Sequence, residues 1–81
     1  MNKAQVLEAL TQVFRDVFDD DDIVLTAATT AQDIEGWDSQ AHVSLIVAAE
    51  MKFGIRFRTA ELESLHDVGQ FAGLIAGKLE G

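Results

Sequence analysis

Apolar residues recur at helical spacing in three stretches of this 81-residue chain, and no proline interrupts them. The stripe in the first stretch, residues 3–18, is made of Leu7, Leu10, Phe14, Val17 and Phe18, and Val6 and Val13 are expected at its edge. Further apolar stripes run through residues 39–53 and 67–79. Because a period of 3.6 places such residues on one face of a helix, each stretch predicts a helix packed on a shared core. The fold is therefore expected to be all-α.

Two shorter signals refine this prediction. Asp67 is followed three residues later by Gln70, which is the spacing of a capping box at a helix start. Residues 59–63 predict a short helical turn, with Leu62 and Leu65 pointing inward. The chain is thus expected to contain three main helices and one short one.

Three glycines form one lateral strip on the last predicted helix, namely Gly69, Gly73 and Gly77. In a helix interior each glycine costs about 1 kcal/mol relative to alanine. We interpret the strip as a tolerant surface on a marginal helix. The alternative is the close approach of a neighbouring helix or a ligand.

Residues 19–36 lack a helical period and predict an unusually long connection. Four apolar residues are expected to pin this loop to the core, and these are Ile23, Val24, Leu25 and Ile34. A short strand at residues 23–26 is the alternative, but the sequence offers it no convincing partner strand. We therefore expect an ordered loop.

The net charge of −8 is concentrated in residues 16–38, a segment without lysine or arginine. Nucleic acid is an unlikely partner for such a chain, because a phosphate backbone demands the opposite sign. The segment would steer a partner with a basic surface, or would serve only as a solvated acidic loop. It is not an EF-hand, because counting from Asp19 puts Val24 where glycine is required and Thr30 where glutamate is required.

The length of the chain predicts a single domain over residues 1–81. There is no apolar run long enough to span a membrane and no recognisable signal peptide, so a cytoplasmic monomer is expected. The chain has no cysteine, so it has no thiol of its own for chemistry.

Asp38 and Ser39 stand where the long loop meets the helix of residues 39–53. A serine there is expected at or just inside the helix start, with its hydroxyl exposed beside unpaired backbone N–H groups. Those groups and the helix dipole suit a phosphate. The simpler interpretation is that Asp38 or Ser39 is only a helix cap.

The helix of residues 39–53 is apolar on two sides. The core face is expected to consist of His42, Leu45, Ile46, Ala49 and Phe53. The residues nearly opposite are Gln40, Val43, Ser44, Val47 and Met51, none of them charged. Because a small domain cannot easily bury both sides, we expect the second side to face a partner. We call Gln40, Val43, Val47 and Met51 the docking strip.

Asp38, Ser39 and His42 include the residue types of a hydrolase triad, but no catalytic role is expected. Asp38 is next to the serine rather than placed to orient the imidazole, and no nucleophile elbow is present. His42 is expected to be a partly buried, hydrogen-bonded histidine. A metal site made of His42 and His66 lacks a third ligand, so no metal is expected either.

Several motifs together resemble the acyl carrier protein family. They are Gly36-Trp37-Asp38-Ser39, Val43-x-Leu45-Ile46, Glu50-x-x-Phe53-Gly54-Ile55 and Thr59-Ala60-Glu61-Leu62. The resemblance covers nearly the whole chain. It implies a four-helix bundle with a long first loop, and a carrier rather than an enzyme.

The resemblance also implies a cofactor and partners. Ser39 would carry 4′-phosphopantetheine, added from coenzyme A by a phosphopantetheinyl transferase. The thiol of that group would present acyl thioesters to ligases, synthases or acyltransferases of fatty acid, polyketide or related synthesis. The residues implied in partner binding are Asp38, Gln40, Val43, Ser44, Val47, Glu50 and Met51.

The chain departs from the usual family pattern in the helix after Ser39. Gln40 stands where leucine is usual, and Ser44 and Met51 stand where acidic residues are more usual. These departures favour a specialised carrier over the housekeeping one. Two alternatives stay open: a peptidyl or aminoacyl carrier, and an unmodified helical module for protein interaction.

Overall fold

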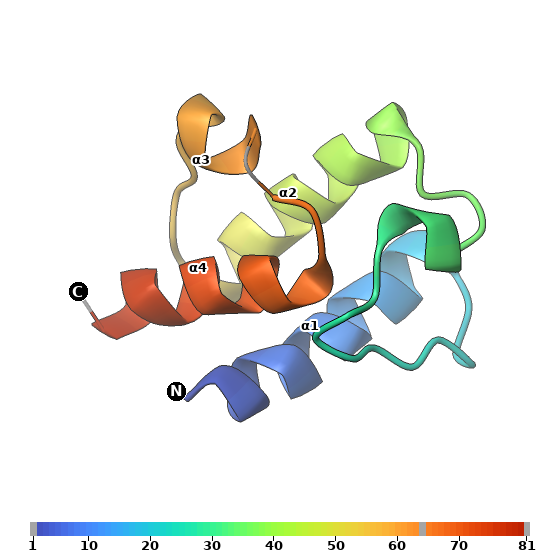
Figure 1. The fold of residues 1–81 in the computed structure, drawn as a ribbon, viewed down its shortest axis with the longest axis horizontal. Helices are drawn as coiled ribbons and strands as arrows, with labels where there is room; N and C mark the ends of the chain where they lie inside the picture. Colours follow the sequence, from blue (N-terminus) through green and yellow to red (C-terminus); the bar gives the residue numbers. More distant parts are fainter. Residues whose placement is uncertain (1, 64, 81) are drawn as a thin grey trace.

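The protein is all-α, as the periodicity predicts. The computed structural model describes residues 2–63 and 65–80, and within them no strand is formed. The elements in chain order are α1 (Lys3–Phe18), the 3-10 helix η1 (Ala31–Asp33), α2 (Ser39–Phe53), α3 (Thr59–Glu63) and α4 (Val68–Glu80). Three long helices and one short helix form the bundle (Figure 1). Residues 1, 64 and 81, which belong to the predicted domain, lie outside the described residues.

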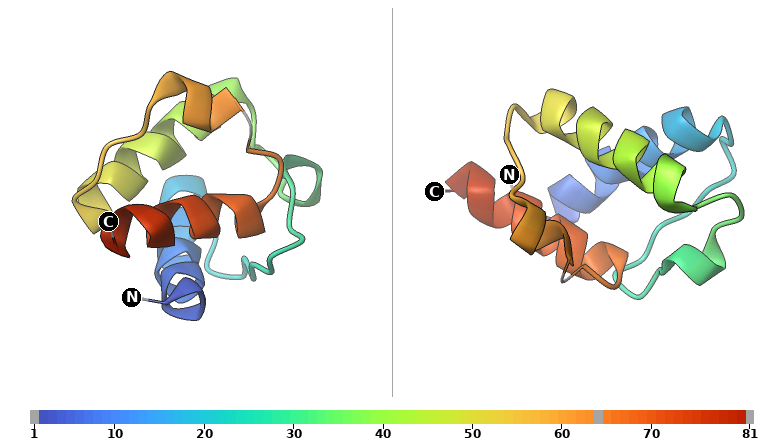
Figure 2. Two further views of the ribbon diagram at one scale, coloured as in Figure 1. Left: turned by 60° about the vertical axis from the view of Figure 1, so that its left-hand side comes forward. Right: turned by 90° about the horizontal axis from the view of Figure 1, so that it is seen from above.

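Helix α1 is the centre of the bundle, because it packs against both α2 and α4. Figures 1 and 2 show that α2 and α4 both run back toward the end of the molecule at which α1 begins. The loop from α1 to α2 turns around the other end. The start of α2 therefore lies far from the first residues of α1 and the last residues of α4 (Figure 2).

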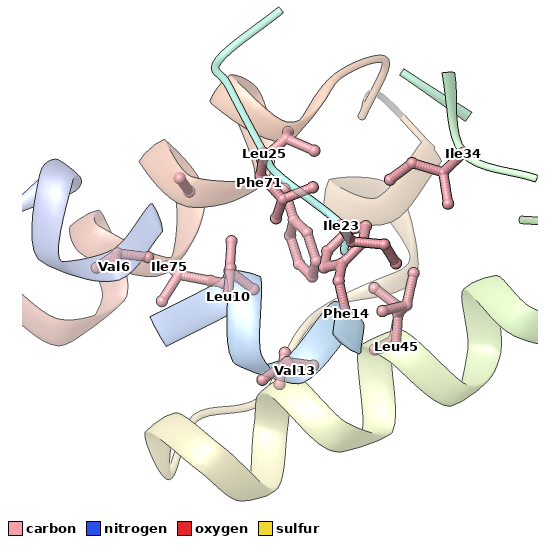
Figure 3. Close-up of a cluster of buried hydrophobic side chains, with 14 residues drawn as sticks. Val6, Leu10, Val13, Phe14, Ile23, Leu25, Ile34, Leu45, Phe71 and Ile75 are labelled. Atoms are coloured by element: carbon pink, nitrogen blue, oxygen red, sulfur yellow. The ribbon is translucent and has the colours of Figure 1, made fainter. Parts of the chain in front are cut away.

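The core is built from one face of each long helix together with three residues of the long loop (Figure 3). Its buried members are Val6, Leu10, Val13, Phe14, Ile23, Leu25, Ile34, Leu45, Ile46, Ala49, Val68, Phe71, Ala72 and Ile75. Removing a side chain of the size of leucine or phenylalanine from water contributes about 1.5–3 kcal/mol. This core anchors the long loop as well as the helices.

The loop is ordered through Ile23, Leu25 and Ile34, which are buried. The prediction for Val24 is wrong, because 74% of its surface is exposed. In extended chain successive side chains point to opposite sides, so Val24 faces out when Ile23 and Leu25 face in. The Arg15 Nε donates a hydrogen bond to the Ile23 carbonyl at 2.9 Å and fixes this path.

The loop and α4 meet at Gly69. The Val68 N–H donates to the Thr29 carbonyl at 2.8 Å, and the Gly69 N–H donates to the Ala27 carbonyl at 2.9 Å. A Cβ on Gly69 would lie 2.7 Å from the Ala27 carbonyl oxygen. The interpretation of the glycine strip as a tolerant surface is therefore wrong at Gly69.

The same interpretation fits the other two glycines of the strip. A Cβ on Gly73 would meet only the end of the Lys3 side chain at 3.9 Å, and one on Gly77 would meet nothing within 4 Å. The strip is thus a close contact at one end and open surface at the other.

Side-chain caps define the starts of the helices. The Asp67 carboxylate accepts the Gln70 N–H at 2.8 Å, as predicted, but the Gln70 side chain accepts the His66 N–H rather than that of Asp67. A complete capping box stands at α1 instead, between Asn2 and Gln5. None of the helices in the described part of the chain has the length and hydropathy that crossing a membrane requires.

Candidate functional site

Ser39 is the first residue of α2 and is exposed, as the sequence predicts. The chain turns at Gly36, which has a positive φ of 86°, and the Asp38 N–H donates back to the Gly36 carbonyl at 2.9 Å. Asp38 is the N-cap, and its carboxylate accepts the Ala41 N–H at 2.8 Å. This cap turns the chain into the helix and leaves the Ser39 side chain outside the core.

The first turn of α2 offers free hydrogen-bond donors beside that hydroxyl. Asp38 satisfies the N–H of Ala41 with its side chain and that of His42 with its carbonyl. The N–H groups of Ser39 and Gln40 find no acceptor among the residues that the structure describes. Unpaired N–H groups at a helix start, together with the helix dipole, favour an anion at this position.

Trp37 fixes the loop immediately before the serine. Its indole Nε1–H donates to His42 Nδ1 at 3.2 Å, and its ring lies edge-on to Phe14 with centroids 5.1 Å apart. His42 is therefore a half-buried, hydrogen-bonded histidine, which confirms the prediction for this residue. The bond between Trp37 and His42 was not predicted, because no local pattern shows that the indole folds back onto the helix.

A cavity of about 430 Å³ lies beside Ser39. Its walls come from the long loop, the start of α2, the segment between α3 and α4, and α4 itself. The lining residues are Ala31, Trp37, Asp38, Ser39, His42, Leu65, His66, Asp67 and Phe71. An exposed hydroxyl, free N–H donors and a cavity of ligand size thus meet at one point.

One comparison with known proteins decides the family. No protein-family model matches the chain, and no curated protein matches it. Among solved structures it is similar to the holo acyl carrier protein from Geobacter metallireducens, determined in solution by NMR. The two chains are 51% identical, the match covers 93% of this chain and 86% of that one, and the TM-score is 0.88. The chain belongs to the acyl carrier protein family.

The function of this acyl carrier protein is to carry acyl groups. Its helix α2 has a buried side and an exposed side. Leu45 and Ala49 are fully buried. The exposed fractions on the other side are 62% for Val43, 48% for Val47 and 79% for Met51. The prediction that α2 is apolar on a buried side and on an exposed side is therefore confirmed.

The polar residues of α2 differ in their surroundings. Gln40, which belongs to the docking strip, and Ser44 are both exposed. Glu50 is half-buried, and its Oε2 accepts the Phe57 N–H at 2.9 Å. This carboxylate holds the chain after α2 in place, so it contributes less to the outer surface of the carrier than its sequence position suggests.

The other groups that the sequence singles out do not form a reaction centre. Asp38 caps Ala41, whereas His42 accepts from Trp37, so the acid does not orient the imidazole. His42 and His66 both line the cavity. Within residues 2–63 and 65–80, no group of three histidine, cysteine, aspartate or glutamate side chains could hold a metal ion.

Proposed function

We propose that Ser39 carries 4′-phosphopantetheine, attached through a phosphodiester to its Oγ by a transferase that uses coenzyme A. The observation that carries this proposal is the exposed Ser39 hydroxyl at the first residue of α2, beside two unpaired N–H groups. The similar protein from Geobacter metallireducens is described as the holo form, which supports the same assignment. When attached, the group supplies a thiol that holds acyl groups as thioesters.

The residues of the chain position that group and leave the chemistry to other proteins. The N–H groups of Ser39 and Gln40 are placed to donate to the phosphodiester oxygens. Asp38 holds the helix start in shape through its bond to Ala41. The protein is accordingly a carrier on which partner enzymes act, and not itself an enzyme.

We propose that these partners bind the exposed side of α2. This surface contains Asp38, Gln40, Val43, Ser44, Val47, Glu50 and Met51. Its centre is the docking strip, which exposes large apolar side chains without a charge among them. Partners must release the carrier after each step, so a small contact area is expected. The partners are the transferase and the ligase, synthase or acyltransferase enzymes of one pathway.

The scarcity of acidic residues on α2 supports a specialised carrier over the housekeeping one. Glu50 is the only acidic residue within α2, and its carboxylate accepts a hydrogen bond from the Phe57 N–H. We therefore expect the holo protein to fail in fatty acid elongation with standard synthase enzymes. Efficient elongation would count against specialisation. We also propose that residues 1–81 act as one domain, which the single shared core supports, and that this domain is a monomer.

Intact mass tests the attachment site. The protein is incubated with coenzyme A, magnesium and a permissive phosphopantetheinyl transferase, alongside Ser39→Ala and Ser44→Ala. Ser44 is the matched control, because it is also exposed on α2. We expect a phosphopantetheine adduct on the wild type and on Ser44→Ala, and none on Ser39→Ala. An adduct on Ser39→Ala, or no adduct on a wild type under conditions that modify another carrier, would overturn the assignment.

The same reaction tests the docking strip. Val47→Asp places a charge in the middle of the strip, and Gln12→Asp places the same charge on the exposed side of α1. We expect Val47→Asp to slow the modification of Ser39 without preventing it, and Gln12→Asp to leave the rate unchanged. Equal rates of Ser39 modification in the two variants would show that the transferase does not bind the docking strip.

A further inference from the structure

We infer that Lys52, Arg56 and Arg58 form a basic patch at the end of α2, and that this patch binds carboxylate side chains on the surface of a partner enzyme. This inference rests on the proposal that partners bind the exposed side of α2. It goes beyond that proposal because it states which charge the partner carries and at which end of α2 the partner carries it.

The basic patch is an exception in an acidic chain. The protein has 6 lysine and arginine residues against 14 aspartate and glutamate residues, and its net charge is −8. Half of the basic residues lie within residues 52–58, a segment without an acidic residue. The side chains of Lys52, Arg56 and Arg58 are all exposed. Three positive charges are therefore concentrated on a short stretch of surface.

No carboxylate of the fold neutralises these charges. Within residues 2–63 and 65–80 the only ion pair joins Lys78 to Glu61. The acidic residues nearest in the sequence bond to backbone groups: Glu50 accepts the Phe57 N–H at 2.9 Å, and Glu61 accepts the Arg58 N–H at 2.8 Å. The side-chain charges of the basic patch are thus available to an external group.

The fold holds the two arginines in a fixed outward position. Ile55 and Phe57 are half-buried against the core, whereas Arg56 and Arg58 are exposed. This alternation is that of extended chain, in which successive side chains point to opposite sides. The Phe57 ring packs on Phe71 with centroids 5.6 Å apart and anchors the segment. A partner that binds the arginines therefore does not have to order their backbone first.

Helix stability accounts for only one of the three residues. Lys52 lies in the last turn of α2, where a positive charge interacts favourably with the helix dipole. Arg56 and Arg58 lie beyond the end of the helix at Phe53, so this explanation does not extend to them.

The chemistry of the patch favours a protein surface as its occupant. A guanidinium group binds a carboxylate through two parallel hydrogen bonds. Met51, which precedes Lys52, is 79% exposed and adds an apolar contact beside the charges. A protein offers carboxylates and apolar side chains together. Nucleic acid or an anionic membrane would be repelled by the acidic remainder of the chain.

Opposite charges flank the two ends of α2. Residues 16–38, which precede the helix, carry acidic side chains without a lysine or arginine, and the basic patch lies where the helix ends (Figure 1). A matching partner carries basic groups near Ser39 and carboxylates near Met51. Complementary charges fix the register of two surfaces, so this arrangement would orient the carrier with Ser39 toward the partner's active site.

An NMR titration with peptides of known charge tests the inference. The probe is a helical peptide with a stripe of leucines flanked by glutamates, and the control peptide has lysines in place of the glutamates. Each is added to the isotope-labelled protein at neutral pH, in its apo and holo forms. We expect the glutamate peptide to shift the backbone N–H signals of residues 47–58, and the lysine peptide to shift those of residues 16–38. Added salt should weaken both interactions.

Two variants that each remove one exposed positive charge test the role of the patch. Arg56→Gln removes it from the patch, and Lys3→Gln removes it from the start of α1. We expect Arg56→Gln to weaken binding of the glutamate peptide by about two- to fivefold, which is the range of an exposed ion pair. Lys3→Gln is expected to leave the affinity unchanged. Circular dichroism checks that both variants are folded.

The inference is overturned if the glutamate peptide shifts no signals of residues 47–58, or if Arg56→Gln and Lys3→Gln bind it equally well. Sedimentation with vesicles of phosphatidylcholine and phosphatidylglycerol tests a lipid surface instead. Binding of the wild type but not of Arg56→Gln to these vesicles would overturn the assignment to a protein partner. The wild-type titration decides the main point even where a variant does not fold.

The test is independent of the proposed attachment site. Intact mass reports whether Ser39 is modified, whereas the titration of the apo form reports on the patch alone. If Ser39 is modified and the glutamate peptide does not bind, the inference fails and the proposed carrier function stands. If the peptide binds and Ser39 cannot be modified, the proposed carrier function fails.

Discussion

Gly69 shows how a single residue can decide the path of a long loop. Its N–H donates to the Ala27 carbonyl, and the loop backbone packs where a side chain would otherwise stand. Gly77 lies on the same lateral strip of α4 but faces open space. Two residues of one type on one helix thus have opposite structural roles.

Alanine substitutions at these two glycines are expected to change stability in opposite directions. In Gly69→Ala the Cβ would sit 2.7 Å from the Ala27 carbonyl oxygen, so the loop must move, and we expect a loss of about 1–3 kcal/mol. In Gly77→Ala the added Cβ meets no atom within 4 Å. We therefore expect the higher helix propensity of alanine to raise the free energy of unfolding by up to about 1 kcal/mol. Urea unfolding of both variants measures this difference. A Gly69→Ala variant as stable as the wild type would contradict this prediction, because it would show that the loop can move away at little cost in free energy.

At the scale of elements, α3 depends on its neighbours. A helix of five residues is not stable alone, because nucleation costs more than so few hydrogen bonds return. Glu61 of α3 forms an ion pair with Lys78 of α4 at 2.8 Å and accepts the Arg58 N–H at 2.8 Å. The Lys78 ammonium also lies over the Phe57 ring at 5.9 Å. These contacts connect α3 to the last turns of α4.

The ion pair of α3 predicts a pH dependence. The hydrogen bond from Lys78 and then that from the Arg58 N–H hold the pKa of Glu61 below its ordinary value of 4.5. A carboxyl with a lowered pKa in the folded state stabilises that state above the unfolded value, and this contribution is lost as the pH falls through the folded value. Because the Glu61 side chain is partly exposed to solvent, which screens the ion pair, the effect is expected to be small.

Glu61→Gln tests this dependence by urea unfolding at neutral pH and at a pH below 4.5. We expect the variant to be less stable than the wild type at neutral pH, and the two to converge in acid. Glu63→Gln is the control, because Glu63 is exposed on the same helix and makes no ion pair within the described residues. A constant gap between wild type and Glu61→Gln across this range would contradict the assignment.

The site and the helices differ in how far local sequence predicts them. The periodic stripes predict α1, α2 and α4 and the two sides of α2, because these properties depend on neighbours within a few turns. The position of Ser39 at the start of α2 is predicted by the same local pattern. The bond from Trp37 to His42, the Gly69 contact and the cavity depend on how the long loop crosses the bundle. The prediction for Val24 is wrong because apolar character alone does not say to which side an extended residue points.

At the scale of the whole molecule, charge is unevenly distributed. The net charge is −8, and residues 16–38 carry acidic side chains without a lysine or arginine. This segment wraps one end of the bundle, so folding brings like charges together. Such self-repulsion opposes the compact state and is screened by salt.

The melting temperature is therefore expected to rise when the ionic strength increases from about 0.01 M to about 0.15 M, as the screening length shortens to about 8 Å. A double variant, Asp21→Asn with Asp22→Asn, removes two exposed charges of the loop and is expected to show a smaller rise. Thermal unfolding followed by circular dichroism measures both. A melting temperature of the wild type that is indifferent to salt would contradict this account.

The route of the chain also has a practical consequence. Since α1 begins and α4 ends at the end of the molecule opposite the start of α2, a fluorescent tag or surface tether fused before α1 or after α4 would lie on the side away from Ser39, the first residue of α2 (Figures 1 and 2). Molecules immobilised in this way would expose the start of α2 to the bulk solution, where a soluble enzyme could reach Ser39.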